Sequence, residues 1–115
     1  MKEGYSINPG SYLHKYNENE PYYVLGLATR AVESIKGESF GTALWVEGFE
    51  KSGKVSGERI QIFRSPGGDY TFEPIDPFES PPEIVVYRQD YKGTYDPGQL
   101  WGRSIPDFLE NFEPA

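Results

Sequence analysis

The pattern of apolar and polar positions along the chain predicts a mainly β protein. Short segments rich in β-branched and aromatic residues are bounded by Gly, Pro, Asn or Asp, as is typical of strands and turns. In one of them Ile60 and Ile62 alternate with Arg59 and Gln61, which indicates a strand with one buried face. The predicted strands cover residues 11–16, 22–28, 42–49, 55–63, 83–88 and 100–103.

Two of these segments carry further information. Residues 22–28 are apolar at successive positions, which is typical of a central strand, and Gly26 inside it predicts a bulge or bend. The Gly-containing segment 50–54 separates two strands and predicts a hairpin. Residues 29–38 could form one helical turn, which Gly37 would end.

The last part of the chain has the signature of a short helix. Ser104 is a cap residue, Pro106 suits the first turn, and Asp107 follows three positions after the cap. Phe108 and Phe112 are four positions apart and would share one face. We therefore predict a short C-terminal helical turn with an apolar side.

Residues 65–82 have a different composition, because they hold five of the ten prolines. We interpret this stretch as an extended excursion over the surface, held down by Tyr70, Phe72 and Phe78. Its acids could offer a weak cation site, but solvated loop charge is the simpler interpretation. These acids are Glu73, Asp76 and Glu79.

Composition narrows the class of protein. In 115 residues, 10 Pro and 13 Gly leave little room for long helices, so a helical bundle is excluded, and the length predicts a single domain spanning residues 1–115. The absence of Cys excludes thiolate chemistry and disulfides, and a net charge of −7 disfavours nucleic acid as a partner. No signal or membrane segment is evident, so we expect a cytoplasmic protein that uses no membrane. We also expect a monomer or homodimer that uses no metal or cofactor.

Two blocks of the sequence resemble a known family. Residues 9–28 (PGSYLHKYNENEPYYVLGLA) and 84–112 (IVVYRQDYKGTYDPGQLWGRSIPDFLENF) are similar to the opening and the close of a small bacterial domain of unknown function, the family numbered sixteen fifty-three. Leu13 stands where the family has Arg, and Ser104 where it has Pro. The resemblance implies a small SH3-like β-barrel or roll in which residues 39–83 are an insertion, a hairpin followed by the Pro-rich loop. It implies no reaction.

A cluster of aromatic and arginine residues in the second block is the main candidate binding site. Alternation places Val85, Tyr87 and Tyr91 on one face of their strand and Val86 and Arg88 on the other. Trp101 and Arg103 share a face of the next strand, and His14 matches a family motif position. Such a cluster is either core or an aromatic groove for a peptide, a protein or a small anionic ligand. The predicted ligand-binding residues are Tyr87, Arg88, Tyr91, Trp101, Arg103 and His14.

Catalysis is the weaker hypothesis, and no catalytic residue is assigned. His14 is the one histidine, and no nucleophile motif surrounds any Ser. The leading hypothesis is a non-enzymatic binding or adaptor module. Two alternatives stay open: a small hydrolase or lyase that uses His14 with a carboxylate, and an oligomerising structural protein in which the 39–64 hairpin pairs edge to edge.

Overall fold

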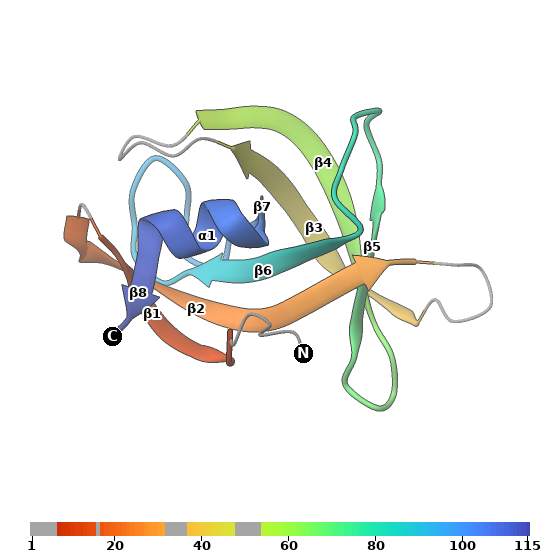
Figure 1. Ribbon diagram of the computed structural model, residues 1–115, viewed down its shortest axis with the longest axis horizontal. Coiled ribbons are helices and arrows are strands. Elements are labelled where there is room, and N and C mark those ends of the chain that lie inside the picture. Colours follow the sequence, from red (N-terminus) through yellow and green to blue (C-terminus); the bar gives the residue numbers. More distant parts are fainter. Residues whose placement is uncertain (1–6, 16, 32–36, 48–53) are drawn as a thin grey trace.

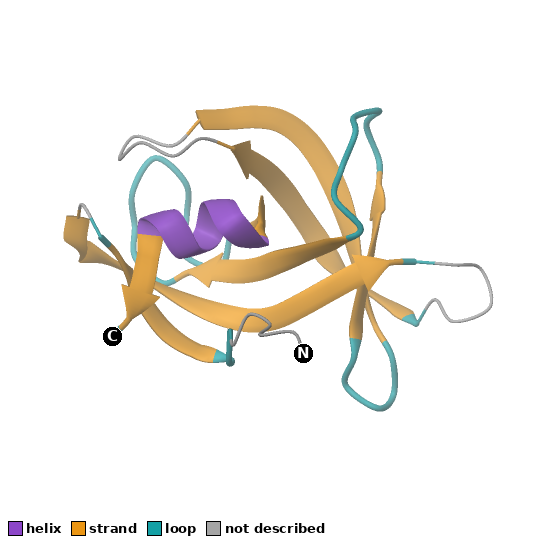
Figure 2. Ribbon diagram, in the orientation of Figure 1, coloured by secondary structure: helices purple, strands orange, loops and turns teal. Residues whose placement is uncertain are grey.

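The computed structural model describes residues 7–15, 17–31, 37–47 and 54–115, and these form eight strands and one short helix (Figures 1 and 2). The elements, in chain order, are β1 (Gly10–His14), β2 (Asn17–Arg30), β3 (Glu38–Glu47), β4 (Lys54–Arg64), β5 (Tyr70–Pro74), β6 (Glu83–Gln89), β7 (Leu100–Ser104), α1 (Ile105–Asn111) and β8 (Phe112–Pro114).

Six of the strands close into a barrel. Their order is β5-β4-β3-β7-β6-β2, and residues 28–30 of β2 pair in parallel with residues 70–72 of β5 to complete the circle. The N-terminal half of β2 also pairs with β1, while its residues 22–24 stay paired with β6. Strand β1 in turn pairs with β8. The mainly β fold, its barrel and the short C-terminal helix are therefore confirmed.

The barrel interior holds one of two apolar cores. Its fully buried members come from five strands, and Leu100 of β7 packs against them. Gly102 of β7 also faces this core, because a Cβ built there would lie 3.3 Å from Ile60 and 3.4 Å from Ile84. Small residues at such positions allow the narrow barrel to close. The buried members are Ala28, Ala43, Trp45, Ile60, Ile62, Phe72, Ile84 and Val86.

A second core lies on the opposite face of β2, β6 and β7, where α1 and β8 cover the sheet (Figure 1). Adjacent residues of β6 divide between the two cores, with Val85 and Tyr87 in the second and Val86 in the interior. Phe108 and Phe112 stack with their ring centroids 4.5 Å apart and pack against Tyr87. The predicted division of the faces of β6 is confirmed.

The predicted irregularity at Gly26 is a β-bulge in β2. The register against β6 shifts between Val24 and Gly26, and Gly26 has φ +147°. The extra residue changes the face of the strand, so Val24 packs into the second core while Ala28 points into the barrel. The bulge therefore moves the fully buried positions of β2 from the second core to the barrel interior.

Helix α1 begins as its sequence predicts. Ser104 is the N-cap and its hydroxyl accepts a hydrogen bond from the Asp107 N–H at 3.2 Å. Pro106 lies in the first turn, and Phe108 is fully buried. Within the described residues, no helix is long and apolar enough to cross a membrane.

The middle of the chain differs from its prediction. Residues 65–82 are not only a surface excursion, because they contain β5, whose Phe72 is fully buried in the barrel. The segment 39–83 supplies most or all of β3, β4 and β5, half of the strands of the barrel. The sequence did not predict β5, because Pro74 stands at its end, further prolines flank it, and proline is unfavourable inside a strand. The helical turn proposed within 29–38 and the hairpin turn at 50–54 fall largely outside the described residues.

Candidate functional site

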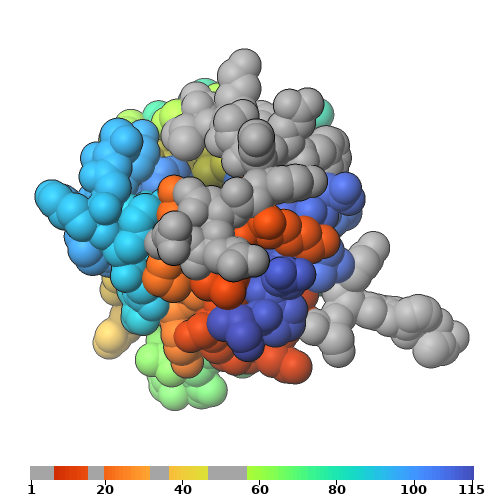
Figure 3. Space-filling model, turned by 90° about the vertical axis from the view of Figure 1, so that its left-hand side faces the viewer, coloured from red at the N-terminus to blue at the C-terminus, as the bar shows by residue number. Residues whose placement is uncertain are grey.

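A cavity of about 380 Å³ opens on the side of the sheet that carries the second core. It lies between the end of β1, strands β2, β6 and β7, the tip of β3 and the loop 90–99. In Figure 3 this loop forms the left edge of the face that is shown, and β1 and the C-terminal segment lie in its middle and lower part. The lining residues are His14, Glu20, Tyr22, Val46, Tyr87, Gln89, Tyr91, Gly93, Thr94, Tyr95, Trp101, Arg103 and Phe112.

Five of the six predicted site residues line this cavity. They are His14, Tyr87, Tyr91, Trp101 and Arg103. Tyr87 and Trp101 are direct partners in the β6–β7 ladder, which explains why two residues far apart in sequence meet at one wall.

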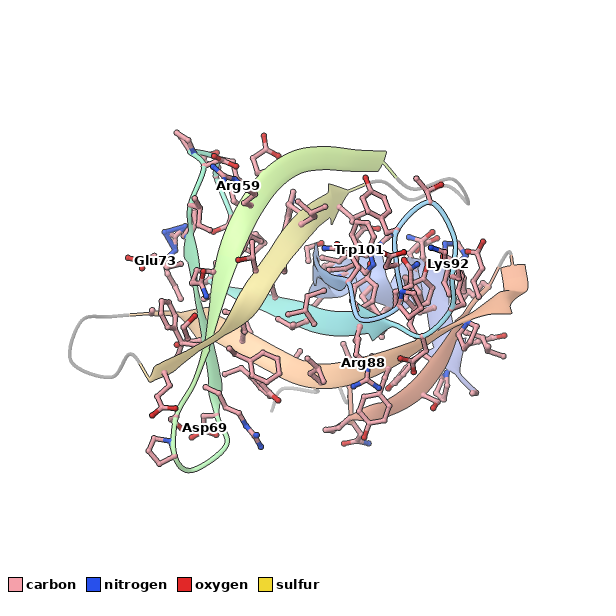
Figure 4. All side chains as sticks on the ribbon, turned by 180° about the vertical axis from the view of Figure 1, so that it is seen from behind. Arg59, Asp69, Glu73, Arg88, Lys92 and Trp101 are labelled. Carbon is pink, nitrogen blue, oxygen red and sulfur yellow. The ribbon has the colours of Figure 1, made fainter. Side chains whose placement is uncertain are left out.

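Arg88 does not join the other five. It follows Tyr87 in β6 and therefore points to the opposite side of the sheet. There its guanidinium lies over the Tyr23 ring, 5.0 Å from the centroid, and Nε donates to Asp90 at 2.9 Å. Figure 4 labels Arg88 and Trp101 on their respective strands.

A buried ion pair lies next to the cavity, because Arg103 is among the lining residues. Arg103 Nη1 donates to Asp107 Oδ1 at 2.9 Å, and both side chains are about 5 % exposed or less. Arg103 Nε donates to the Tyr87 hydroxyl at 2.9 Å. Burial opposes the charged guanidinium, but the interactions with Tyr87 and Asp107 outweigh it and raise the pKa of Arg103. Burial also raises the pKa of Tyr87 to about 12, so Tyr87 stays a neutral phenol.

Tyr22, Tyr91 and the carboxylate of Glu20 form a further part of the lining. The hydroxyls of Tyr22 and Tyr91 are 2.7 Å apart, and their rings meet at 89°. Burial, together with the hydrogen bond to Tyr91, raises the pKa of Tyr22. Burial and the charge of Glu20 raise the pKa of Tyr91, although the hydrogen bond from Tyr22 opposes the shift.

The loop 90–99 is held by one buried amide. Gln89 Nε2 donates to the carbonyl oxygens of Tyr91 and Tyr95, at 2.9 and 2.6 Å. Gln89 Oε1 accepts from Trp101 Nε1 at 3.3 Å. The amide therefore connects the loop to β7. The Tyr95 ring meets the Trp101 ring at 90°, with centroids 4.9 Å apart. Lys92 on this loop pairs with Asp96 at 2.7 Å.

His14 lies at the end of β1, where its ring meets Phe112 edge-on with centroids 4.9 Å apart. Burial, and then the positive charge of Arg103, lower the pKa of His14 below its usual 6.5. The imidazole is therefore neutral at pH 7.

The lining residues are core residues as well. Trp101 is 5 % exposed and Tyr87 is 2 % exposed. The sequence left open whether these residues belong to the core or to a groove, and in the structure they do both. These side chains pack against α1 or the loop 90–99 on one side and bound the cavity on the other.

Sequence reasoning missed several lining residues, among them Glu20, Tyr22, Gln89, Tyr95 and Phe112. Tyr22 belongs to a run with apolar residues on both faces, so its side could not be assigned. Tyr95 stands in a turn and Glu20 in a polar stretch, where no periodicity applies.

The other hollows and the acidic residues of the Pro-rich segment are weaker candidates for a functional site. A hollow of about 460 Å³ lies around Arg64, and one of about 650 Å³ lies over β2 and β5. The walls of both consist mostly of exposed or half-buried residues. Asp76 of the Pro-rich segment is bound by Arg59, with Nη2 2.9 Å from Oδ1. Figure 4 places Arg59, Asp69 and Glu73 at the opposite side of the molecule from Trp101 and Lys92. Among the described residues, no group of three or more His, Asp or Glu side chains could hold a metal ion.

The fold and the cavity define a class: a closed six-stranded β-barrel whose flanking core encloses an aromatic pocket. Comparison of the chain with protein-family models gives no match, and comparisons with curated proteins and with solved structures give none either. The resemblance to the family numbered sixteen fifty-three stays a prediction.

Proposed function

We propose that this chain is a non-enzymatic binding module whose cavity takes up one small organic group, carried by a free ligand or by a peptide or protein. The observation that carries the proposal is the convergence of aromatic side chains from β2, β6, β7, β8 and the loop 90–99 on one cavity. Its volume of about 380 Å³ falls within the ~300–1,000 Å³ range of small-molecule pockets. Its walls combine apolar rings with a few polar groups, as such pockets do.

The rigidity of the walls supports binding. Tyr22, Tyr87 and Trp101 sit on paired strands, and the Gln89 amide holds the loop that carries Tyr91 and Tyr95. A pocket whose walls are already ordered loses little conformational entropy when a ligand enters. A likeness to SH3-like barrels, which bind ligands through aromatic residues, would fit this role.

The alternative of a small hydrolase or lyase would use His14 with Glu20, the carboxylate that lines the same cavity. The lowered pKa of His14 makes the imidazole a weaker base, and its ring edge packs against Phe112. Binding without chemistry is therefore the proposal that the cavity favours.

Nuclear magnetic resonance with indole as a neutral aromatic probe tests the proposal. The two tryptophans report different places, since Trp101 lines the cavity and Trp45 belongs to the barrel interior. We expect indole to shift the Trp101 side-chain N–H resonance and to leave that of Trp45 unchanged.

Tyr95→Leu should weaken indole binding about tenfold, because it removes one aromatic wall. Phe40→Leu is the matched control, since Phe40 is an exposed aromatic residue outside the cavity. Equal shifts of both tryptophans, or equal binding by the two variants, would contradict the proposed function.

A further inference from the structure

Among the described residues at the cavity, positive and negative charges do not balance. The guanidinium of Arg103 is paired with the buried carboxylate of Asp107, and His14 is neutral at pH 7. Glu20 lines the cavity as well, and it brings a second carboxylate to the group. Glu20, Arg103 and Asp107 together therefore carry one net negative charge.

Several of the hydrogen-bond donors that an anion would need are already engaged. Trp101 Nε1 donates to Gln89, whose own amide donates to two backbone carbonyl oxygens. Arg103 donates to Asp107 and to the Tyr87 hydroxyl. Anion recognition rests on free N–H and O–H donors, so the small anionic ligand expected from the sequence would have to break these bonds.

The aromatic rings provide the opposite kind of surface. Ring faces carry partial negative charge and attract cations within about 6 Å of the ring centroid. Neighbouring rings stand at right angles, at 89° for Tyr22 and Tyr91 and 90° for Tyr95 and Trp101, so they form separate walls. The chain already uses this attraction at Phe112, where the Arg103 guanidinium carbon lies 5.2 Å from the ring centroid.

This inference rests on the proposed function. We propose that the cavity selects an organic cation with an alkylated ammonium group. The cation is held by the charge of Glu20 and by four aromatic rings, those of Tyr22, Tyr91, Tyr95 and Trp101. Such a group spreads its charge over methyl surfaces and offers few or no N–H donors, which suits walls made mainly of aromatic rings. A primary ammonium would keep strong hydration that this cavity does not replace. The net charge of −7 on the chain attracts cations toward it.

The test compares choline with 3,3-dimethylbutan-1-ol, a neutral molecule of the same shape. The Trp101 side-chain N–H resonance follows both titrations. We expect choline to bind about tenfold more tightly, because only choline carries the charge. A short peptide with one trimethyllysine forms a further arm, which distinguishes a free ligand from a side chain of a partner.

Glu20→Gln separates charge from shape. It should weaken choline binding about fivefold and leave 3,3-dimethylbutan-1-ol binding unchanged. Glu79→Gln is the matched control, because it makes the same change of net charge at an exposed residue that does not line the cavity. Heat denaturation of each variant verifies that it is folded.

The outcomes separate this inference from the proposed function. If indole and the neutral alcohol shift Trp101 but choline binds no better than the alcohol, the cation inference is overturned and the binding function stands. Preference for benzoate over choline would overturn it as well. If none of the probes shifts Trp101, both proposals fail.

Discussion

Buried polar side chains give the cavity its chemistry at the scale of single residues. Arg103, Asp107 and Asn111 follow one another at intervals of four, and Asn111 Nδ2 donates to Asp107 Oδ1 at 2.8 Å. A buried charge is costly unless it is paired, so Asp107 offsets the cost of burying the Arg103 guanidinium next to the cavity. The sequence showed the two residues but not that each neutralises the other.

His14 predicts a pH dependence of stability. Its pKa in the folded state is lowered by burial and by Arg103, so the unfolded chain binds a proton more readily than the folded chain. The contribution of His14 to the free energy of unfolding should therefore be fully present above about pH 6.5 and should decrease as the pH falls below that value. Urea unfolding between pH 7.5 and 5 measures the effect.

His14→Gln provides the control for this prediction, because the chain has no other histidine. The variant should show a flatter dependence between pH 7.5 and 5. Stability losses from Asp76, whose pKa is lowered to about 2 by its hydrogen bonds with Arg59, fall at lower pH and do not overlap this range. The same slope in both proteins would contradict the assignment to His14.

At the scale of elements, the bulge in β2 decides which side chains reach the cavity. Without the extra residue, Val24 and Ala28 would face the same side of the strand, since side chains alternate with a period of two. The shift at Gly26 sends Tyr22 and Val24 to the second core and Ala28 to the barrel interior.

Gly26→Ala should lower the free energy of unfolding by about 1–3 kcal/mol, because a side chain at φ +147° strains the backbone. The space itself is adequate, with the nearest Tyr70 atom 3.8 Å from a built Cβ. Gly67→Ala is the matched control, since its φ lies outside the range that favours glycine and a Cβ there would touch Ser65 Oγ alone, at 3.8 Å. Equal stability of the two variants in urea would contradict the role of the bulge.

At the scale of the whole molecule, the two cores share one sheet. Strand β6 contributes Val86 to the interior and Val85 to the second core, and both side chains are fully buried. Loss of either core removes one face of the same strand, so the cores should form and unfold together.

Val85→Ala and Val86→Ala test this coupling as a matched pair. Each should lower the free energy of unfolding by about 2 kcal/mol, since each deletes two buried methyl groups. Fluorescence follows the two cores separately. Trp45 reports the barrel interior in a Trp101→Phe background, and Trp101 reports the second core in a Trp45→Phe background. We expect one common midpoint in both backgrounds. Two separate transitions would show that the cores are independent.

The sequence predicted the local features well. Strand periodicity, the bulge at Gly26, the cap at Ser104 and the shared face of Trp101 and Arg103 all depend on neighbours in the chain, and each is present. The sequence did not predict β5, because prolines stand at one end of this strand and in the flanking loops. The five residues of β5 pair with residues of β4 and β2. A strand so short is defined by its partners more than by its own pattern.

The sequence by itself determined the class of fold, the absence of cysteine chemistry and the residue types that could bind a ligand. Only the tertiary structure decided that Tyr22, Tyr95 and Glu20 join His14, Tyr87, Tyr91, Trp101 and Arg103 around one cavity. It also decided that Arg88 points away and that Asp107 offsets the charge of Arg103. The physical reason is that alternation and capping act over a few residues, whereas a cavity and its net charge depend on strand order, register and burial across the whole chain.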